Sequence, residues 1–252
     1  MSERIFTKWI TCPRPNPKAS MRLFCLPFAG GGASTYRLWP AALPSSVEVC
    51  PIQLPGREDR YREPALTSLV GLSRALSREL LPFLDKPFAF FGHSMGTLVA
   101  FETARALRHS AAPAPLAMFL AAYPAPHVPL ARAPIHQLPD EEFIREMRRR
   151  QGTPAAVLDN AELMAFVLPI LRADFEACDT YACPSEPPLD CPFFMYGGTD
   201  DREVDPRGLE RWREQTSSAF SRRMLPGTHF FVQSHRDRLL DDIAGRLASL
   251  PV

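Results

Sequence analysis

A serine flanked by glycines stands between a short apolar run and a helical stretch, and this arrangement constrains the fold most strongly. Residues 92–96 read Gly-His-Ser-Met-Gly and directly follow an apolar run at 88–91 that is typical of a buried strand. The Ala- and Leu-rich stretch 97–107 that follows predicts a helix. A chain that passes so quickly from strand to helix must turn sharply, and the flanking glycines remove Cβ atoms that would clash there. The hydroxyl of Ser94 is then exposed at the end of the strand, where a nucleophile is needed.

Short apolar runs alternate with longer amphipathic stretches along most of the chain, which is typical of a parallel sheet covered by helices. Strands are expected at 22–27, 47–54, 88–91, 116–122, 192–196 and 221–225, and helices at 66–84, 97–107, 206–216 and 235–250. Together with the serine turn after the third strand, this pattern predicts an α/β-hydrolase fold. Its central sheet is expected to be mostly parallel and flanked by helices.

One segment breaks the alternation because it contains helical patterns and no strand-like run. These helices are expected at 140–150, 161–171 and 172–181. We therefore expect a single domain over 1–252, with a core at 1–123 and 189–252 and a helical lid insertion at about 124–188. A lid excludes water from a charged transition state and shapes an acyl pocket. The alternative is that the same helices are additional packing with no gating role.

Composition excludes several other classes of protein. The formal net charge is +1 over 252 residues, which gives no reason to expect binding to nucleic acid or to an acidic membrane. No stretch approaches the roughly 18 apolar residues of a membrane span, and residues 1–20 contain no apolar signal region. The six cysteines form no C-x-x-C pair and fit no zinc pattern. We expect a cytoplasmic monomer that needs neither a metal ion nor a cofactor of its own.

A serine hydroxyl is a weak nucleophile at neutral pH and needs a histidine to accept its proton. Of the six histidines, His93 lies inside the serine turn and cannot fold back onto its neighbour. His229 lies just after an expected strand, in a Pro-Gly-Thr-His turn at the edge where strand ends gather, and is the expected base. The acid that orients its imidazole should also follow a strand, between the serine and the histidine. Asp200 and Asp201 both meet this condition. Neighbouring residues of an extended turn point in opposite directions, so only one of the two can serve.

The negatively charged oxygen that forms during acyl transfer needs two backbone N–H donors. We expect one from Met95, directly after the serine, and the other from the loop after the first strand. In that loop Ala29 is the preferred donor and Phe28 is the alternative. The glycines of the same loop lack the spacing of either type of phosphate-binding loop, which argues against a nucleotide site.

With these residues assembled, the chain resembles the type II thioesterases, stand-alone hydrolases that accompany modular polyketide and nonribosomal peptide synthases. The matching blocks follow the family order across nearly the whole chain: Leu26–Ser34, Trp39, Gln53–Arg57, Phe91–Gly96 and Gly227–Phe231. In this family the acidic residue stands three positions before a valine and eleven before a tryptophan. Asp201 satisfies both spacings and Asp200 neither, so the resemblance favours Asp201. Thr228 departs from the family, in which a second glycine is common before the histidine.

The resemblance implies that Ser94 attacks an acyl thioester carried on the phosphopantetheine arm of an acyl or peptidyl carrier protein. His229 would accept the hydroxyl proton and later activate water, and the implied role is to clear stalled or aberrant acyl groups from a synthase. Two other readings stay open at this point. A small-molecule carboxylesterase or an acyltransferase would use the same residues, and a binding module for carrier proteins would retain the site without using it.

Overall fold

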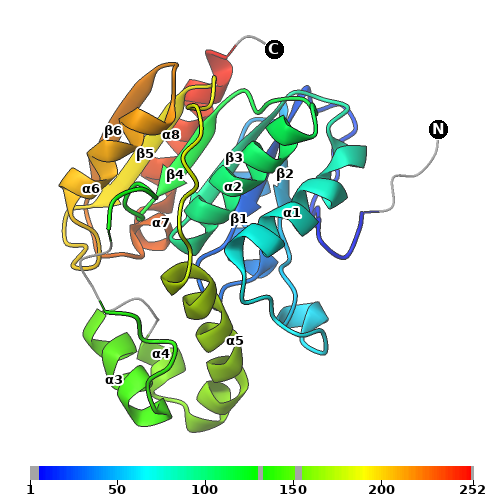
Figure 1. Cartoon of the computed structure of the whole chain (residues 1–252). Coiled ribbons are helices and arrows are strands. Elements are labelled where there is room, and N and C mark those ends of the chain that lie inside the picture. Colours follow the sequence, from blue (N-terminus) through cyan, green and yellow to red (C-terminus); the bar gives the residue numbers. More distant parts are fainter. Residues whose placement is uncertain (1–5, 130–132, 151–154, 251–252) are drawn as a thin grey trace.

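The computed structural model describes residues 6–129, 133–150 and 155–250. At its centre lies a six-stranded sheet in which every neighbouring pair of strands is parallel (Figure 1). In chain order the strands are β1 Met21–Leu26, β2 Val47–Pro51, β3 Phe88–His93, β4 Met118–Ala121, β5 Phe193–Gly198 and β6 Phe220–Leu225. Their order in space is β2-β1-β3-β4-β5-β6. The predicted α/β-hydrolase fold and all six of its strands are confirmed.

The chain adds β2 on one side of β1 and the later strands on the other. Parallel sheets bind their ligands beyond the carboxyl ends of the strands, at such a change of direction. The loop that follows β1 and the turn that follows β3 therefore lie side by side at the place where a site is expected. These are the two segments that carry the expected oxyanion donors and the serine.

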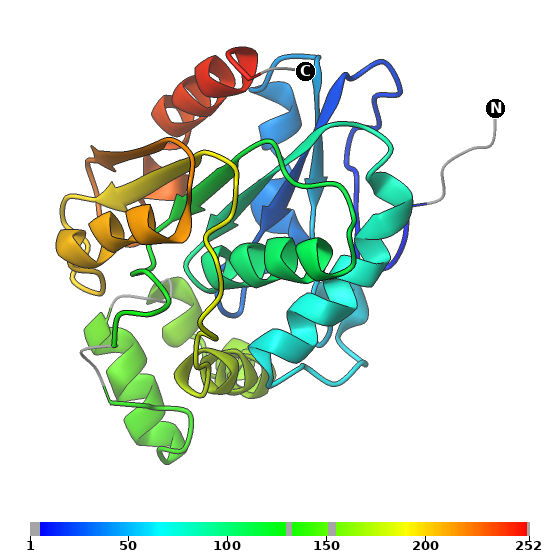
Figure 2. The same cartoon turned by 45° about the horizontal axis from the view of Figure 1, so that its top comes forward.

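Helices cover both faces of the sheet (Figures 1 and 2). One face carries α1 Leu69–Leu80 and α2 Met95–His109, and the other carries α8 Arg236–Ala248. Successive strand residues point to opposite faces, so Phe24 packs with the first layer and Leu23 with the second. The remaining helices of the core are short: α6 Pro206–Glu210 and α7 Phe231–Ser234, with 3-10 turns at Ala33–Tyr36, Trp39–Ala41, Glu58–Arg60, Leu81–Phe83 and Arg211–Gln215.

Three helices connect β4 to β5: α3 Asp140–Arg150, α4 Ala155–Leu158 and α5 Ala161–Asp179. They lie beyond the carboxyl edge of the sheet (Figure 1) and enclose an apolar cluster of their own that includes Phe143, Met147 and Met164. We expected two helices where the single helix α5 runs through Pro169. No capping residue stands near 171–172 to end the helix there, which explains why it continues.

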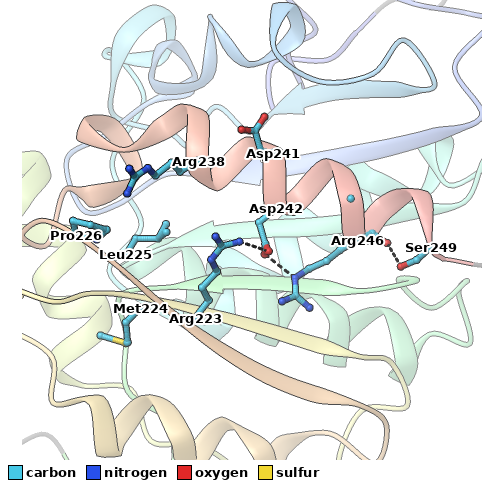
Figure 3. Close-up of a pocket in the computed structure, with 10 residues that line it drawn as sticks. Arg223, Met224, Leu225, Pro226, Arg238, Asp241, Asp242, Arg246 and Ser249 are labelled. Atoms are coloured by element: carbon cyan, nitrogen blue, oxygen red, sulfur yellow. Dashed lines mark hydrogen bonds and ion pairs between the residues drawn. The ribbon is translucent and has the colours of Figure 1, made fainter.

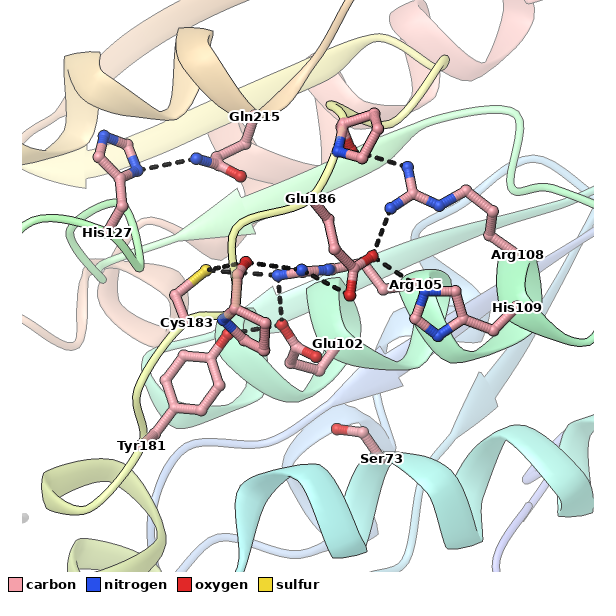
Figure 4. A network of polar contacts seen from close by, with 12 residues as sticks. Ser73, Glu102, Arg105, Arg108, His109, His127, Tyr181, Cys183, Glu186 and Gln215 are labelled. Atoms are coloured by element: carbon pink, nitrogen blue, oxygen red, sulfur yellow. Dashed lines mark hydrogen bonds and ion pairs between the residues drawn. The ribbon is translucent and has the colours of Figure 1, made fainter.

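The chain that leaves α5 is fastened to α2 by a network of charged groups (Figure 4). The Tyr181 hydroxyl donates to the carboxylate of Glu102 at 2.5 Å. Arg105 forms ion pairs with Glu102 at 2.9 Å and with Glu186 at 2.8 Å, and Arg108 pairs with Glu186 at 2.6 Å. The insertion therefore returns to the core at a fixed point.

A search of the described residues finds no helix with the length and apolar character that a membrane span requires.

Candidate active site

Ser94 lies between β3 and α2 in a strained backbone conformation, with φ of 54° and ψ of −121°. Such values cost free energy in a non-glycine residue and are maintained only when the surroundings fix them. Here the Ser94 N–H donates to the carbonyl of Ala121 at 2.8 Å, and its carbonyl accepts from Thr97 N–H at 2.9 Å. A Cβ atom on Gly92 would clash with the backbone of Gly96. The sharp turn expected from the glycine spacing is therefore present.

The structure brings Ser94, His229 and Asp201 together. His229 Nε2 lies 2.9 Å from Ser94 Oγ, and His229 Nδ1 lies 2.9 Å from Asp201 Oδ2. The other oxygen of Asp201 accepts the N–H of Glu203 at 2.8 Å. The Asp201 side chain is only 2% exposed. Held by these two contacts, the Asp201 carboxylate fixes the orientation of the imidazole.

Asp200 takes a different position from its neighbour. It is exposed, and its carboxylate accepts the N–H of Gly227 at 3.3 Å. Its own N–H donates to the Gly227 carbonyl at 2.9 Å. Asp200 thus joins the loop after β5 to the loop that carries His229, and it makes no recorded contact with the imidazole. The contact with His229 belongs to Asp201, the aspartate that the family spacing favoured.

His93, which was not a candidate for the base, binds the backbone of His229. It is fully buried, and its Nε2 lies 2.9 Å from the backbone carbonyl of His229. Burial, together with the nearby His229, lowers the pKa of His93 to about 3, so the ring is neutral near pH 7. Because a carbonyl only accepts, Nε2 must carry the proton of this neutral ring. Sequence reasoning missed this contact, which joins segments that lie far apart in the chain.

The two expected oxyanion donors belong to segments that meet at the cavity of Ser94. Met95 is the first residue of α2, where backbone N–H groups have no partner within the helix. Ala29 and Phe28 line the same pocket as Ser94. The next N–H in that loop, on Gly30, is already bound to Asp174 at 2.7 Å. Met95 and Ala29 therefore remain our candidates for the donors.

A buried ion pair joins the insertion to this loop. Arg57 binds Asp174 of α5 through two contacts, at 2.6 and 2.8 Å, and neither side chain is more than 4% exposed. The same carboxylate accepts the N–H of Gly30, next to Ala29. The sequence analysis did not identify this pair. A signal was present, because Asp174 lies on the face of α5 that also carries the buried Ile170.

The site opens into a cavity of about 550 Å³ between the core and the insertion. Tyr123 and Val204 of the core line it, as do Met147 and Phe175 of the insertion. Another cavity, of about 600 Å³, lies between the C-terminal half of β6 and α8, and no residue of the serine site lines it (Figure 3). There Asp242 of α8 accepts from Tyr196 of β5 at 2.7 Å and from Arg223 of β6 at 2.5 Å, and these bonds join α8 to the sheet. The cavity that Ser94 and His229 line is therefore the candidate substrate-binding site.

Comparison with known proteins agrees with this geometry. A family model described as a thioesterase domain matches residues 21–247. The gramicidin S biosynthesis protein GrsT of Aneurinibacillus migulanus is 43% identical over 240 residues, which cover 95% of this chain and 94% of that protein.

Two solved structures are also similar. The type II thioesterase BorB from the borrelidin biosynthetic cluster has a TM-score of 0.89 and 36% identity, covering 97% of this chain and 100% of that one. The RedJ thioesterase from the prodiginine pathway of Streptomyces coelicolor has a TM-score of 0.85 and 38% identity, covering 92% and 87%. With its serine, histidine and aspartate in hydrogen-bonded order, the chain therefore belongs to the thioesterase domain family.

Proposed function

We propose that this protein is a type II thioesterase that hydrolyses acyl groups from the phosphopantetheine arm of acyl or peptidyl carrier proteins. The observation that carries the proposal is the hydrogen-bonded series Ser94–His229–Asp201, whose serine and histidine line a partly apolar cavity. The similar proteins support the pathway class, since their names refer to gramicidin S, borrelidin and prodiginine biosynthesis. The role that follows is the removal of stalled or aberrant acyl groups from a polyketide or nonribosomal peptide synthase.

The residues suit a two-step acyl transfer. Ser94 Oγ attacks the thioester carbonyl while His229 Nε2 accepts the hydroxyl proton, and the carbonyl oxygen becomes negatively charged between the Met95 and Ala29 N–H groups. The C–S bond then breaks and the sulfur leaves as a thiol that takes the proton from His229, or as a thiolate while His229 releases that proton to solvent. Water, deprotonated by His229, attacks the acyl-serine and releases a carboxylic acid and free Ser94. No cofactor or metal enters these steps, because the phosphopantetheine belongs to the partner.

The insertion is suited to act as the lid. Met147 of α3 and Phe175 of α5 contribute apolar surface to the cavity beside Ser94. An acyl chain bound there would displace water, and a drier site strengthens the interactions of the charged transition state. All of the residues named in the mechanism come from one chain, in keeping with a monomeric enzyme.

A comparison of two substrates tests the proposed function. We expect kcat/KM for acetyl-loaded carrier protein to exceed that for nitrophenyl acetate by about tenfold or more, since only the thioester substrate presents the carrier and its arm. Release of acetate and release of nitrophenolate are measured with the same enzyme preparation. Equal efficiency on both substrates would favour the carboxylesterase. Formation of an acetylated product when an alcohol or amine is added would favour the acyltransferase.

A further inference from the structure

Arginines gather at the cavity that contains Ser94. Arg149 of α3, Arg202 after the triad aspartate, Arg207 of α6 and Arg211 all line it, and all four are exposed. The whole chain is nearly balanced, with 29 basic and 28 acidic residues, so this is a local concentration of positive charge. The carboxylates that line the same cavity are Glu203 and Asp205.

Two of the four arginines already have carboxylate partners. Arg149 binds Glu146 at 2.8 Å, and Arg211 is paired with Glu214. The side chains of Arg202 and Arg207 have no recorded ion pair or hydrogen bond among the residues that the structure describes. Asp205, which lies between them, caps α6 by accepting the backbone N–H of Arg207 at 2.8 Å.

Arg202 and Arg207 line the same cavity as the reacting Ser94. Arg202 directly follows Asp201, so a buried triad acid and an exposed cation share one loop. Arg207 lies in the first turn of α6, where the backbone of Gly208 also reaches the cavity. Both guanidinium groups are therefore available to a molecule that enters the cavity from solvent with its reactive end toward Ser94. Such a molecule should carry a negative charge on a part separate from the end that reacts with Ser94.

We propose that Arg202 and Arg207 bind the phosphate of the phosphopantetheine arm. This proposal rests on the proposed function and assigns the part of the substrate that these residues recognise. The arm has a single charged group, the phosphate that links it to the carrier protein, followed by uncharged amides and the thioester. Guanidinium groups bind phosphate oxygens through paired, charge-assisted hydrogen bonds. The two arginines thus select acyl groups on a phosphorylated arm over simple esters and thioesters.

Two thioesters that differ only in the phosphate test this assignment: acetyl-pantetheine and acetyl-4′-phosphopantetheine. For the wild-type enzyme we expect KM to be about tenfold lower for the phosphorylated substrate, as two partly exposed ion pairs allow. The double variant Arg202→Gln/Arg207→Gln should lose this preference. Arg213→Gln is the matched control, because Arg213 is an exposed neighbour outside the cavity. Added salt should reduce the preference of the wild-type enzyme.

Binding measured without turnover separates this proposal from the proposed function. Calorimetry should show that the wild-type enzyme binds 4′-phosphopantetheine more tightly than pantetheine, and that the double variant does not. If neither of these thioesters nor acetyl-loaded carrier protein is hydrolysed, the proposed function fails, while the calorimetry still tests the arginines. An unchanged preference in the double variant overturns the assignment. So does a defect confined to carrier-bound substrate, which would place the arginines against the carrier protein itself.

Discussion

Three contacts hold His229 in place. Its two ring nitrogens meet Ser94 and Asp201, and its backbone carbonyl accepts a hydrogen bond from the buried His93. A general base is effective when its geometry is fixed before the substrate arrives, because orientation then costs little during the reaction. Because burial lowers the pKa of His93 to about 3, this histidine donates its hydrogen bond as a neutral ring near pH 7.

The two adjacent aspartates provide a test at this scale. Asp201→Asn should lower kcat by about 10⁴-fold, because an amide can stabilise the wrong tautomer of His229 and cannot balance its charge. Asp200→Asn should have a small effect, since its amide oxygen can still accept the Gly227 N–H. Steady-state hydrolysis of the same acyl-carrier substrate measures both variants. A larger loss in Asp200→Asn would mean that the assigned acid is wrong.

Sequence reasoning reached the residues whose position follows from local structure. Ser94 was identified by its glycines, and His229 by its place after a strand. The choice between the aspartates depended on family spacing, because an extended turn does not show which side chain faces inward. His93 and Asp174 were missed, since each acts on a segment more than 130 residues away in the chain. Contacts of that range depend on how the elements pack together.

At the scale of elements, α5 connects the insertion to the loop that follows β1. Its Asp174 accepts one hydrogen bond from Gly30 and two from Arg57, and all of these contacts are buried or partly buried. Two loops of the core are thereby tied to one helix of the insertion. The Ala29 N–H, our candidate oxyanion donor, belongs to the loop that contains Gly30, so its position depends on these contacts. Any movement of the lid must therefore occur in the part of the insertion that lies before Asp174, or it must break this ion pair.

Removal of the charge on Asp174 measures the strength of that connection. Asp174→Asn leaves Arg57 buried without a counter-charge, and we expect the free energy of unfolding to fall by about 3–5 kcal/mol. The matched control is Asp159→Asn, whose exposed ion pair with Arg148 lies in the same insertion. That variant should lose less than about 1 kcal/mol. Urea unfolding near pH 7 gives both values, and losses of similar size would show that the buried pair adds no special stability.

The strands were the elements that could be predicted most completely. Five of the six are short, mostly apolar runs that end at a turn, as expected for strands buried on both faces. The edge strand β6 is partly exposed and contains Arg222 and Arg223. The helices were less certain at their ends. The stretch expected at 206–216 forms α6 and a 3-10 turn, and the two helices expected at 161–181 are the single helix α5. Contacts with distant segments occur where a boundary was expected, as with Arg172 inside α5, which donates to the Leu138 carbonyl at 2.7 Å.

For the whole molecule, the strand order accounts for the place of the site. The serine turn follows β3 and the oxyanion loop follows β1, and these neighbouring strands are central to the sheet. The aspartate and histidine follow β5 and β6, so four strand ends contribute to one reaction. The insertion then covers this edge and supplies one wall of the cavity. The sheet thus fixes the chemistry of acyl transfer, while the insertion is placed to select the acyl group.

The most direct test of this account is the release of acetate from acetyl-loaded carrier protein by the variant Ser94→Ala. We expect its rate to fall by at least about 10³-fold, because Ser94 Oγ is the hydroxyl bound to His229 Nε2 and alanine cannot form the acyl intermediate. Ser110→Ala, at the far end of α2, serves as the matched control and should retain wild-type activity. Circular dichroism verifies that both variants are folded. Turnover near the wild-type rate in Ser94→Ala would contradict the mechanism.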